Sequence, residues 1–170
     1  MSETMVRMGE LVATATAGDV LVSLGLGSCI GLALLDRRMG VAGLAHVVLP
    51  ASEGHNGAQN RFKFADHAVP ELIDRVIALG GRKARLEAAL VGGASMFAVS
   101  SASLEVGQRN EAAVRELLSK ARIPVLAAAT GGKKGRTIRV DPTTSAVSVK
   151  EAGGVQSELL APSRTLEAAA

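Results

Sequence analysis

Cys29 is the only cysteine of the 170-residue chain, and it stands in the glycine-rich segment LGLGSCIGLALL, residues 24–35. A catalytic thiol has to be exposed, has to ionise and needs a base within reach. Gly25 and Gly27 favour a sharp turn that lifts the sulfur out of a sheet, and glycines leave backbone N–H groups free to hold an oxyanion. The segment therefore predicts a nucleophilic turn with Cys29 as the nucleophile.

His46 is the one histidine inside an apolar strand pattern, VAGLAHVVLP at 41–50. If this strand pairs with the strand at 29–36 through the short RRMG turn, Cys29 at the start of one strand comes close to His46 at the end of the other. The hydroxyl of Ser23, in the preceding strand, can accept a hydrogen bond from the imidazole N–H and orient the ring. These three residues form the predicted catalytic group.

Each of these residues also has a purely structural interpretation. A lone cysteine in an apolar strand is most often a small hydrophobic residue, and a lone histidine there is most often a core residue with its hydrogen bonds satisfied. His55 falls in a loop and His67 precedes a helix, so both are expected at the surface. One cysteine and scattered histidines show no zinc-ligand spacing, and no pair of carboxylates stands out, so we predict no metal and no cofactor.

The composition predicts one domain with a substantial core, because 48% of the residues are hydrophobic and 21% are charged. A single cysteine forms no internal disulfide, and the opening MSETMVRMGE lacks the apolar run of a signal peptide. Two uncharged stretches, 20–35 and 88–104, approach the length of a membrane span but are rich in Gly, Ser and Ala. We expect buried strands and turns there, no membrane insertion, and a cytoplasmic protein.

The net charge of +3 does not indicate a nucleic-acid-binding protein, because the basic residues are scattered along the chain. The densest basic cluster, GGKKGRTIR at 131–139, has the pattern of a turn followed by a strand. The chain has no Trp or Tyr and only three Phe, so it lacks the aromatic residues on which bases stack. A mildly basic surface suits an acidic protein partner instead.

The hydrophobic patterns predict strands first and then helices interleaved with strands. The predicted fold is a single-domain α/β layered sandwich of mixed, largely antiparallel sheets with flanking helices. The domain is expected over 1–150, followed by a poorly ordered tail over 151–170 whose ending, TLEAAA, has the character of a cloning remnant. The predicted strands are 20–26, 29–36, 41–50, 85–97, 123–129, 136–141 and 146–150, and the predicted helices are 65–81, with Val69, Leu72, Ile73, Val76 and Leu79 on one face, and 110–122, with Asn110 as N-cap.

Several segments together resemble a known family. LGLGSCIGLALLD followed by GVAGLAHVVLP, then FADHAVPELIDRVIALGG, VGGASMF, GQRN and GGKKGRTIRV, resemble the signature of the CheD family of chemoreceptor glutamine deamidases, over residues 6–150. The resemblance implies hydrolysis of selected glutamine side chains of bacterial chemoreceptors to glutamate and ammonia through a cysteine thioester, without a cofactor. It also implies two partners, the cytoplasmic domain of a chemoreceptor and a CheC-type phosphatase.

The resemblance carries the family's nucleophilic cysteine onto Cys29 and its histidine onto His46. The third member, usually threonine, falls on Ser23, and the usual acidic residues before the later Gly-Gly are replaced by Ala128 and Ala129. These two departures leave a second function open, a non-catalytic chemotaxis adaptor that binds a CheC-type phosphatase or a receptor. A thiol protease or acyltransferase is a third reading of the same residues.

Overall fold

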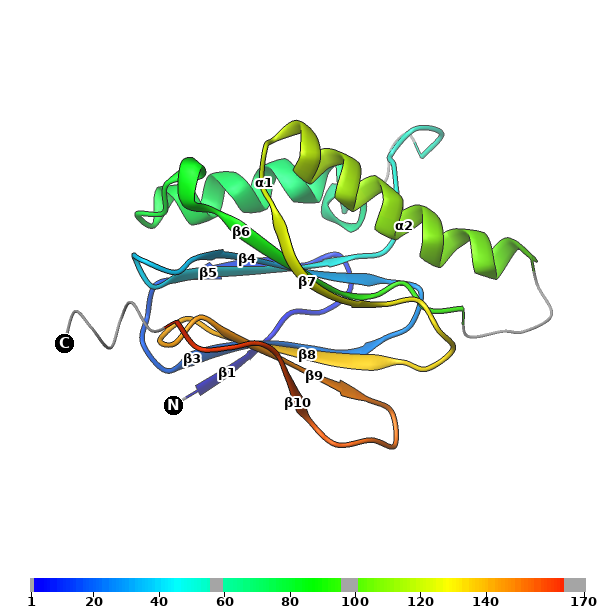
Figure 1. Ribbon diagram of the computed structural model, residues 1–170. Helices are drawn as coiled ribbons and strands as arrows, with labels where there is room; N and C mark the ends of the chain where they lie inside the picture. The colour runs from blue at the N-terminus through cyan, green and yellow to red at the C-terminus, as the bar shows by residue number, and fades with distance from the viewer. Residues whose placement is uncertain (1, 56–59, 96–100, 164–170) are drawn as a thin grey trace.

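The computed structural model describes residues 2–55, 60–95 and 101–163. Over these residues the chain forms two five-stranded sheets and two α-helices, and both helices cover the outer face of one sheet (Figure 1). The layers are therefore helices, sheet and second sheet. This arrangement confirms the predicted α/β sandwich with flanking helices.

The strands and helices follow the predicted order closely through the middle of the chain. The strands are β1 (Ser2–Met5), β2 (Leu11–Thr14), β3 (Asp19–Leu26), β4 (Ile30–Asp36), β5 (Val41–Val47), β6 (Glu87–Gly92), β7 (Val125–Thr130), β8 (Arg136–Asp141), β9 (Ala146–Glu151) and β10 (Ser157–Leu160). The helices are α1 (Ala65–Ala78) and α2 (Ser101–Lys120), with short 3₁₀ turns η1 (Arg61–Lys63) and η2 (Lys83–Arg85).

The two sheets are mixed but largely antiparallel, as predicted. One has the strand order β1-β3-β8-β9-β10 and the other the order β2-β5-β4-β6-β7. Only the pairs β1–β3 and β6–β7 are parallel among the described strands. The long helix α2 makes the crossover between β6 and β7, as a parallel pair requires.

The core consists of two apolar clusters, one on each face of the second sheet. Helix α1 packs Val69, Leu72 and Val76 against one face, while the other face packs against residues of the first sheet such as Leu21 and Val140. Strands β4 and β5 are buried at every position because both of their faces are covered. No helix among the described residues has the length and apolar character needed to cross a membrane.

Three expectations about the elements are wrong. Helix α2 begins at Ser101, so Asn110 lies inside the helix and is not its N-cap. Leu79 follows the end of α1 and is exposed instead of lining the buried face. The tail expected to be poorly ordered contributes β10, which pairs antiparallel with β9 because its backbone finds partners along that edge.

Besides β10, two N-terminal strands were not predicted, and two predicted features lie wholly or partly outside the described residues. The N-terminal strands β1 and β2 add to opposite sheets, so the link between them crosses from one layer to the other. Part of the uncharged stretch 88–104 and the ending TLEAAA lie outside the described residues.

Candidate active site

The predicted hairpin of β4 and β5 is confirmed, and its register places Gly31 directly opposite His46. Cys29 precedes β4 and lies two residues before Gly31, so it is a diagonal neighbour of His46 across the pair. Both residues are on the face that looks toward the first sheet: Cys29 packs against the cluster between the sheets, and His46 alternates with Ala45 and Val47, which face the helices. The hairpin therefore places the two residues diagonally across the strand pair on one face of the sheet.

The turn that carries Cys29 is held by its carbonyl groups. The oxygen of Gly27 accepts a hydrogen bond from the Ala94 N–H at 2.8 Å, and the oxygen of Cys29 accepts one from the Gly93 N–H at 2.9 Å. Between them, the Ser28 oxygen accepts one from a buried side-chain amide at 2.9 Å. Among the described residues, the N–H groups of Gly27 and Ser28 donate to no backbone carbonyl, and N–H groups in such a turn can hold an oxyanion.

Gly92, at the end of β6, is required by this turn. Its φ of +119° is one that residues with side chains rarely adopt, and a Cβ at this position would overlap the carbonyl oxygen of Cys29. Only glycine lets the end of β6 come this close to the backbone behind the thiol. The turn is thus fixed from behind by backbone contacts.

The imidazole of His46 is oriented by a backbone carbonyl. Its Nδ1 lies 3.1 Å from the oxygen of Val6, in the link between β1 and β2. Because a carbonyl only accepts, Nδ1 carries the proton and Nε2 presents a lone pair. Nε2 is buried and has no hydrogen-bond partner among the described residues. The ring is therefore in the tautomer that a general base requires.

The surroundings of His46 favour the neutral ring. Burial lowers the pKa of His46 below its ordinary value of 6.5, while the hydrogen bond to Val6 and the charge of Glu10 act in the opposite direction. The ring is consequently uncharged at neutral pH and can accept a proton.

Ser23 lies beside this carbonyl but does not bond to the imidazole as expected. Its Oγ donates to the Val6 oxygen at 2.7 Å, and the side chain is fully buried between the sheets. The ring N–H that was expected to reach Ser23 goes to Val6 instead. Val6 is the residue that sequence reasoning missed, because a backbone acceptor leaves no signal in the residue type.

The thiol of Cys29 is half-buried, and its environment favours the protonated form. Burial raises the pKa of the Cys29 thiol above its ordinary value of 9.0, and a hydrogen bond from its own backbone N–H only partly offsets this. His46 Nε2 has no hydrogen-bond partner among the described residues, so no thiolate–imidazolium pair is present in this state. The arrangement therefore suits a neutral base that removes the thiol proton during the reaction.

A shallow hollow of about 320 Å³ opens beside the imidazole. Met8 and Leu24 line it and are among the exposed large hydrophobic residues of the protein. A larger hollow of about 540 Å³ lies at the far end of β4, around Arg37 and Arg38. His46 lines the smaller hollow, whereas Cys29 does not.

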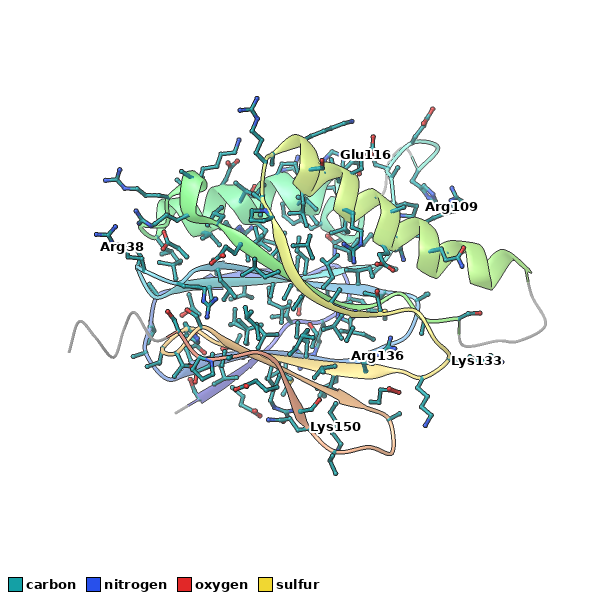
Figure 2. The ribbon with its side chains drawn as sticks, viewed as in Figure 1. Arg38, Arg109, Glu116, Lys133, Arg136 and Lys150 are labelled. Atoms are coloured by element: carbon teal, nitrogen blue, oxygen red, sulfur yellow. The ribbon has the colours of Figure 1, made fainter. Side chains whose placement is uncertain are left out.

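Several basic side chains lie on the same side of the molecule. Arg109, Lys133 and Arg136 lie toward one side, and Arg38, in the turn after β4, lies at the opposite end (Figure 2). Arg136 also braces the site, because its Nη1 donates to the carbonyl oxygens of Gly131 at 2.8 Å and Gly92 at 3.3 Å. The side with Arg109, Lys133 and Arg136 therefore favours an acidic partner.

The remaining histidines do not join the site. His55 and His67 are exposed, as expected, and the His67 ring is 3.2 Å from the Ser52 hydroxyl. Within the described ranges, no three side chains of His, Cys, Asp or Glu are grouped so as to hold a metal ion.

The chain is similar to one protein family over most of its length. A family model named CheD, described as CheD chemotactic sensory transduction, matches residues 48–151. A protein of Clostridium kluyveri named "Probable chemoreceptor glutamine deamidase CheD" is 44% identical over 142 residues, which cover 82% of this chain and 88% of that protein. A protein of the same name from Clostridium botulinum strain Alaska E43 is 43% identical over 157 residues, covering 90% of this chain and 96% of that protein.

The matches differ in whether they include the candidate site residues. The family model begins after His46, whereas the second relative leaves only a tenth of this chain outside its match. Wherever that match begins, it spans Ser23, Cys29 and His46. Among solved structures, the Bacillus licheniformis hypothetical protein YfiH aligns with a TM-score of 0.45 and 16% identity, over 72% of this chain and 49% of that chain, so this chain spans about half of that protein.

Proposed function

The chain belongs to the CheD family, and from this premise we propose that it hydrolyses the side-chain amides of selected chemoreceptor glutamines, with Cys29 as the nucleophile and His46 as the general base and acid. The observation that carries the proposal is the His46 ring. Its Nδ1 proton is directed to Val6, which leaves Nε2 as a bare acceptor on the face of the hairpin that Cys29 shares.

The first half of the reaction forms a thioester. His46 Nε2 takes the thiol proton as Cys29 Sγ attacks the amide carbon of the glutamine, and the carbonyl oxygen becomes an oxyanion. The N–H groups of the turn around Cys29 hold this oxyanion. When the tetrahedral intermediate collapses, the C–N bond breaks and the imidazolium gives its proton to the leaving nitrogen, which departs as ammonia.

The second half of the reaction cleaves the thioester with water. His46, neutral again, takes a proton from water as its oxygen attacks the thioester carbon. The C–S bond then breaks, the sulfur recovers its proton from His46, and a glutamate side chain is released. The sum is one amide and one water converted to one carboxylate and one ammonium ion, so water is the only co-substrate.

Val6 and Ser23 support the base in this proposal. The Val6 carbonyl keeps the proton on Nδ1 and stabilises the imidazolium that forms in each half-reaction. The Ser23 hydroxyl donates to the same oxygen and so fixes where that oxygen points. Ser23 thereby takes the place of the usual threonine as a positioning residue, through Val6 and not through the ring.

The proposed substrate is the cytoplasmic domain of a chemoreceptor, and the proposed site of action is the cytoplasm. The apolar hollow beside His46 can take the apolar part of a protein side chain, and Arg109, Lys133 and Arg136 would attract an acidic protein surface. A CheC-type phosphatase is the second proposed partner. No interaction with nucleic acid and no membrane insertion form part of the proposal.

The test is mass spectrometry of a receptor cytoplasmic fragment after incubation with the protein. Conversion of an amide to an acid adds about one dalton at each modified glutamine, and Cys29→Ala has to abolish this gain. His46→Ala should reduce the rate by about 10²- to 10⁴-fold. Cleavage of the peptide chain, or incorporation of an added amine, would instead indicate a thiol protease or an acyltransferase.

A second candidate function is the non-catalytic adaptor. It is favoured by the raised pKa of Cys29 and by the lack of a hydrogen bond to His46 Nε2 in the described part of the chain. Alkylation with iodoacetamide separates the two functions. Fast alkylation at neutral pH that slows in His46→Ala supports the enzyme, whereas a thiol that reacts only after denaturation supports the adaptor.

A further inference from the structure

Asn110 connects the turn that carries Cys29 to the strand that carries His46. Asn110 lies within α2, and its side chain is fully buried. Its Nδ2 donates two hydrogen bonds, one to the Ser28 oxygen and one to the Val48 oxygen, each at 2.9 Å. Ser28 is the residue before Cys29, and Val48 lies two residues after His46. One nitrogen thus joins the two parts of the candidate site.

We propose that Asn110 is a positioning residue of the deamidation site, which sets the distance between the Cys29 turn and the end of β5. This inference rests on the proposed function. The β4–β5 ladder ends with Ile30 opposite Val47. Beyond that pair, the Val48 N–H donates to the Lys63 oxygen, and the Ser28 oxygen has only Asn110 as a partner among the described residues.

Only an amide fits this role among side chains of similar size. One nitrogen has to donate to two carbonyl oxygens, and the NH₂ group of Asn110 has two protons for this purpose. A carboxylate offers only acceptors and would repel both oxygens, while a hydroxyl has one proton. An aliphatic side chain would leave two buried carbonyl groups without this donor, which is costly.

Helix α2 is seated so that Asn110 can reach both carbonyls. Gly107, one turn earlier, lies so close to the segment after β6 that a Cβ would come within 2.7 Å of the Gly93 oxygen and 2.8 Å of the Ala94 oxygen. The N–H groups of these same two residues hold the Cys29 turn. The helix, the segment after β6 and the turn therefore form one continuous backbone support, to which Asn110 adds the link to β5.

A purely structural role for Asn110 makes a different prediction. If Asn110 only stabilises the fold, its loss lowers the melting temperature and leaves the cooperation of Cys29 with His46 intact in the folded protein. If it positions the two segments, the cooperation is lost while the protein is still folded. A double-mutant cycle measures this cooperation directly.

The experiment compares the iodoacetamide reactivity of Cys29 at pH 7 with and without His46→Ala, in the full chain and in its Asn110→Leu and Asn110→Ser variants. We expect His46→Ala to slow alkylation about tenfold or more in the parent chain and to have no effect in the Asn110 variants. With a receptor fragment, we expect kcat to fall about tenfold or more while KM changes less than about twofold.

Val114→Ala is the matched control, because Val114 is fully buried on the same helix, one turn later, and packs in the helix–sheet cluster. It should lower the melting temperature and keep the dependence of alkylation on His46. Asn110→Ser retains one proton donor and covers the case in which Asn110→Leu does not fold. The inference is overturned if the folded Asn110 variants keep the His46 dependence and kcat of Val114→Ala. A parent chain whose Cys29 ignores His46 and which does not deamidate the receptor would overturn the proposed function as well.

Discussion

His46 and Ser23 donate hydrogen bonds to one and the same atom, the carbonyl oxygen of Val6, at 3.1 and 2.7 Å. The oxygen thereby satisfies two buried donors from two different sheets. Since Val6 lies in the link that crosses between the sheets, the orientation of the imidazole depends on the path of this link. In the proposed mechanism, the third member of the catalytic group is consequently a backbone oxygen, and the hydroxyl group acts through it.

Replacement of Ser23 by alanine should be mild. Ser23→Ala removes one donor to the Val6 oxygen but leaves the bond to His46 Nδ1, so we expect kcat to fall less than about tenfold, against about 10²- to 10⁴-fold for His46→Ala. Ser23→Thr keeps the hydroxyl and restricts its rotamer, and should keep or raise the activity. Steady-state kinetics on a receptor fragment measures both. A loss in Ser23→Ala as large as that in His46→Ala would show direct contact between the hydroxyl and the ring during the reaction.

The pH dependence of kcat/KM should follow the titration of His46. Burial lowers the pKa of His46 below 6.5, so the ring stays neutral, and the enzyme active, below the pH at which a free histidine protonates. The charge of Glu10 acts against burial, so Glu10→Gln should lower this pKa further and move the acid limb of the profile to lower pH. The profile between pH 4 and 8 is the measurement.

Glu116 provides the control for the pH profile. It is exposed on α2 (Figure 2), pairs with Lys120 at 3.2 Å, and is not among the groups that shift the pKa of His46. Glu116→Gln should leave the acid limb unchanged. An acid limb that moves to higher pH in Glu10→Gln would contradict the assignment of that limb to His46.

Replacement of Gly92 by alanine should damage the site and the fold together. The new Cβ would overlap the Cys29 oxygen, and the φ of +119° is strained for any residue with a side chain. We expect a loss of about 1–3 kcal/mol in the free energy of unfolding and a marked fall in kcat. Urea unfolding and kinetics measure the two effects. Gly153→Ala is the control, because its φ of +79° is also strained but no atom lies within 4 Å of the added Cβ. If Gly153→Ala lowers kcat as much as Gly92→Ala does, the overlap with the Cys29 oxygen is not the cause.

Asp36 should matter for stability and not for the reaction. Its carboxylate is buried at the end of β4 that lies away from Cys29, and it accepts from the Arg85 guanidinium at 3.0 Å and from the Arg82 N–H at 2.9 Å. Asp36→Ala leaves the Arg85 guanidinium without its carboxylate partner. It should lower the free energy of unfolding, measured in urea at pH 7, by about 3 kcal/mol or more. The kcat of the folded variant should equal that of the parent.

The stabilisation by Asp36 should also depend on pH. Burial alone would raise the pKa of Asp36, but its hydrogen bonds to Arg85 and to backbone N–H groups hold it below 3.8. A carboxyl whose folded pKa is depressed stabilises the fold above the unfolded pKa, and this stabilisation is lost as the pH falls through the folded pKa. The difference between the parent and Asp36→Ala should therefore shrink in acid. Asp74→Ala, at an exposed position on α1, should show no such difference.

The sequence was sufficient to predict the strands and the hairpin that carry the candidate site. β4 and β5 are nearly continuous apolar runs separated by a short turn, so their pairing, which puts Cys29 and His46 on one face, followed from the pattern. Helix α1 was predicted by its buried spacing of three and four residues, at Val69, Leu72 and Val76.

Other parts of the fold and site left no usable pattern. The strand Ser2–Met5 is short and largely exposed, so it shows no hydrophobic alternation. Every residue has a backbone carbonyl, so nothing in the sequence marks that of Val6 as the acceptor for His46 and Ser23. Asn110 precedes the regular pattern EAAVRELL and is a residue type favoured at helix starts, so it was predicted to be the N-cap. In the fold, α2 begins earlier, at Ser101, and Gly107 permits its close packing against the segment after β6. Long-range contacts, and not local propensity, decide these positions.

The hairpin of β4 and β5 lies in the middle of its sheet and is covered on both faces, and this burial has a kinetic consequence. Its amide protons can exchange with deuterated solvent only when the whole domain opens. The strands that carry His46 and lead away from Cys29 should thus separate only when the domain unfolds, whereas the turn of Cys29, which precedes β4, lies outside this ladder.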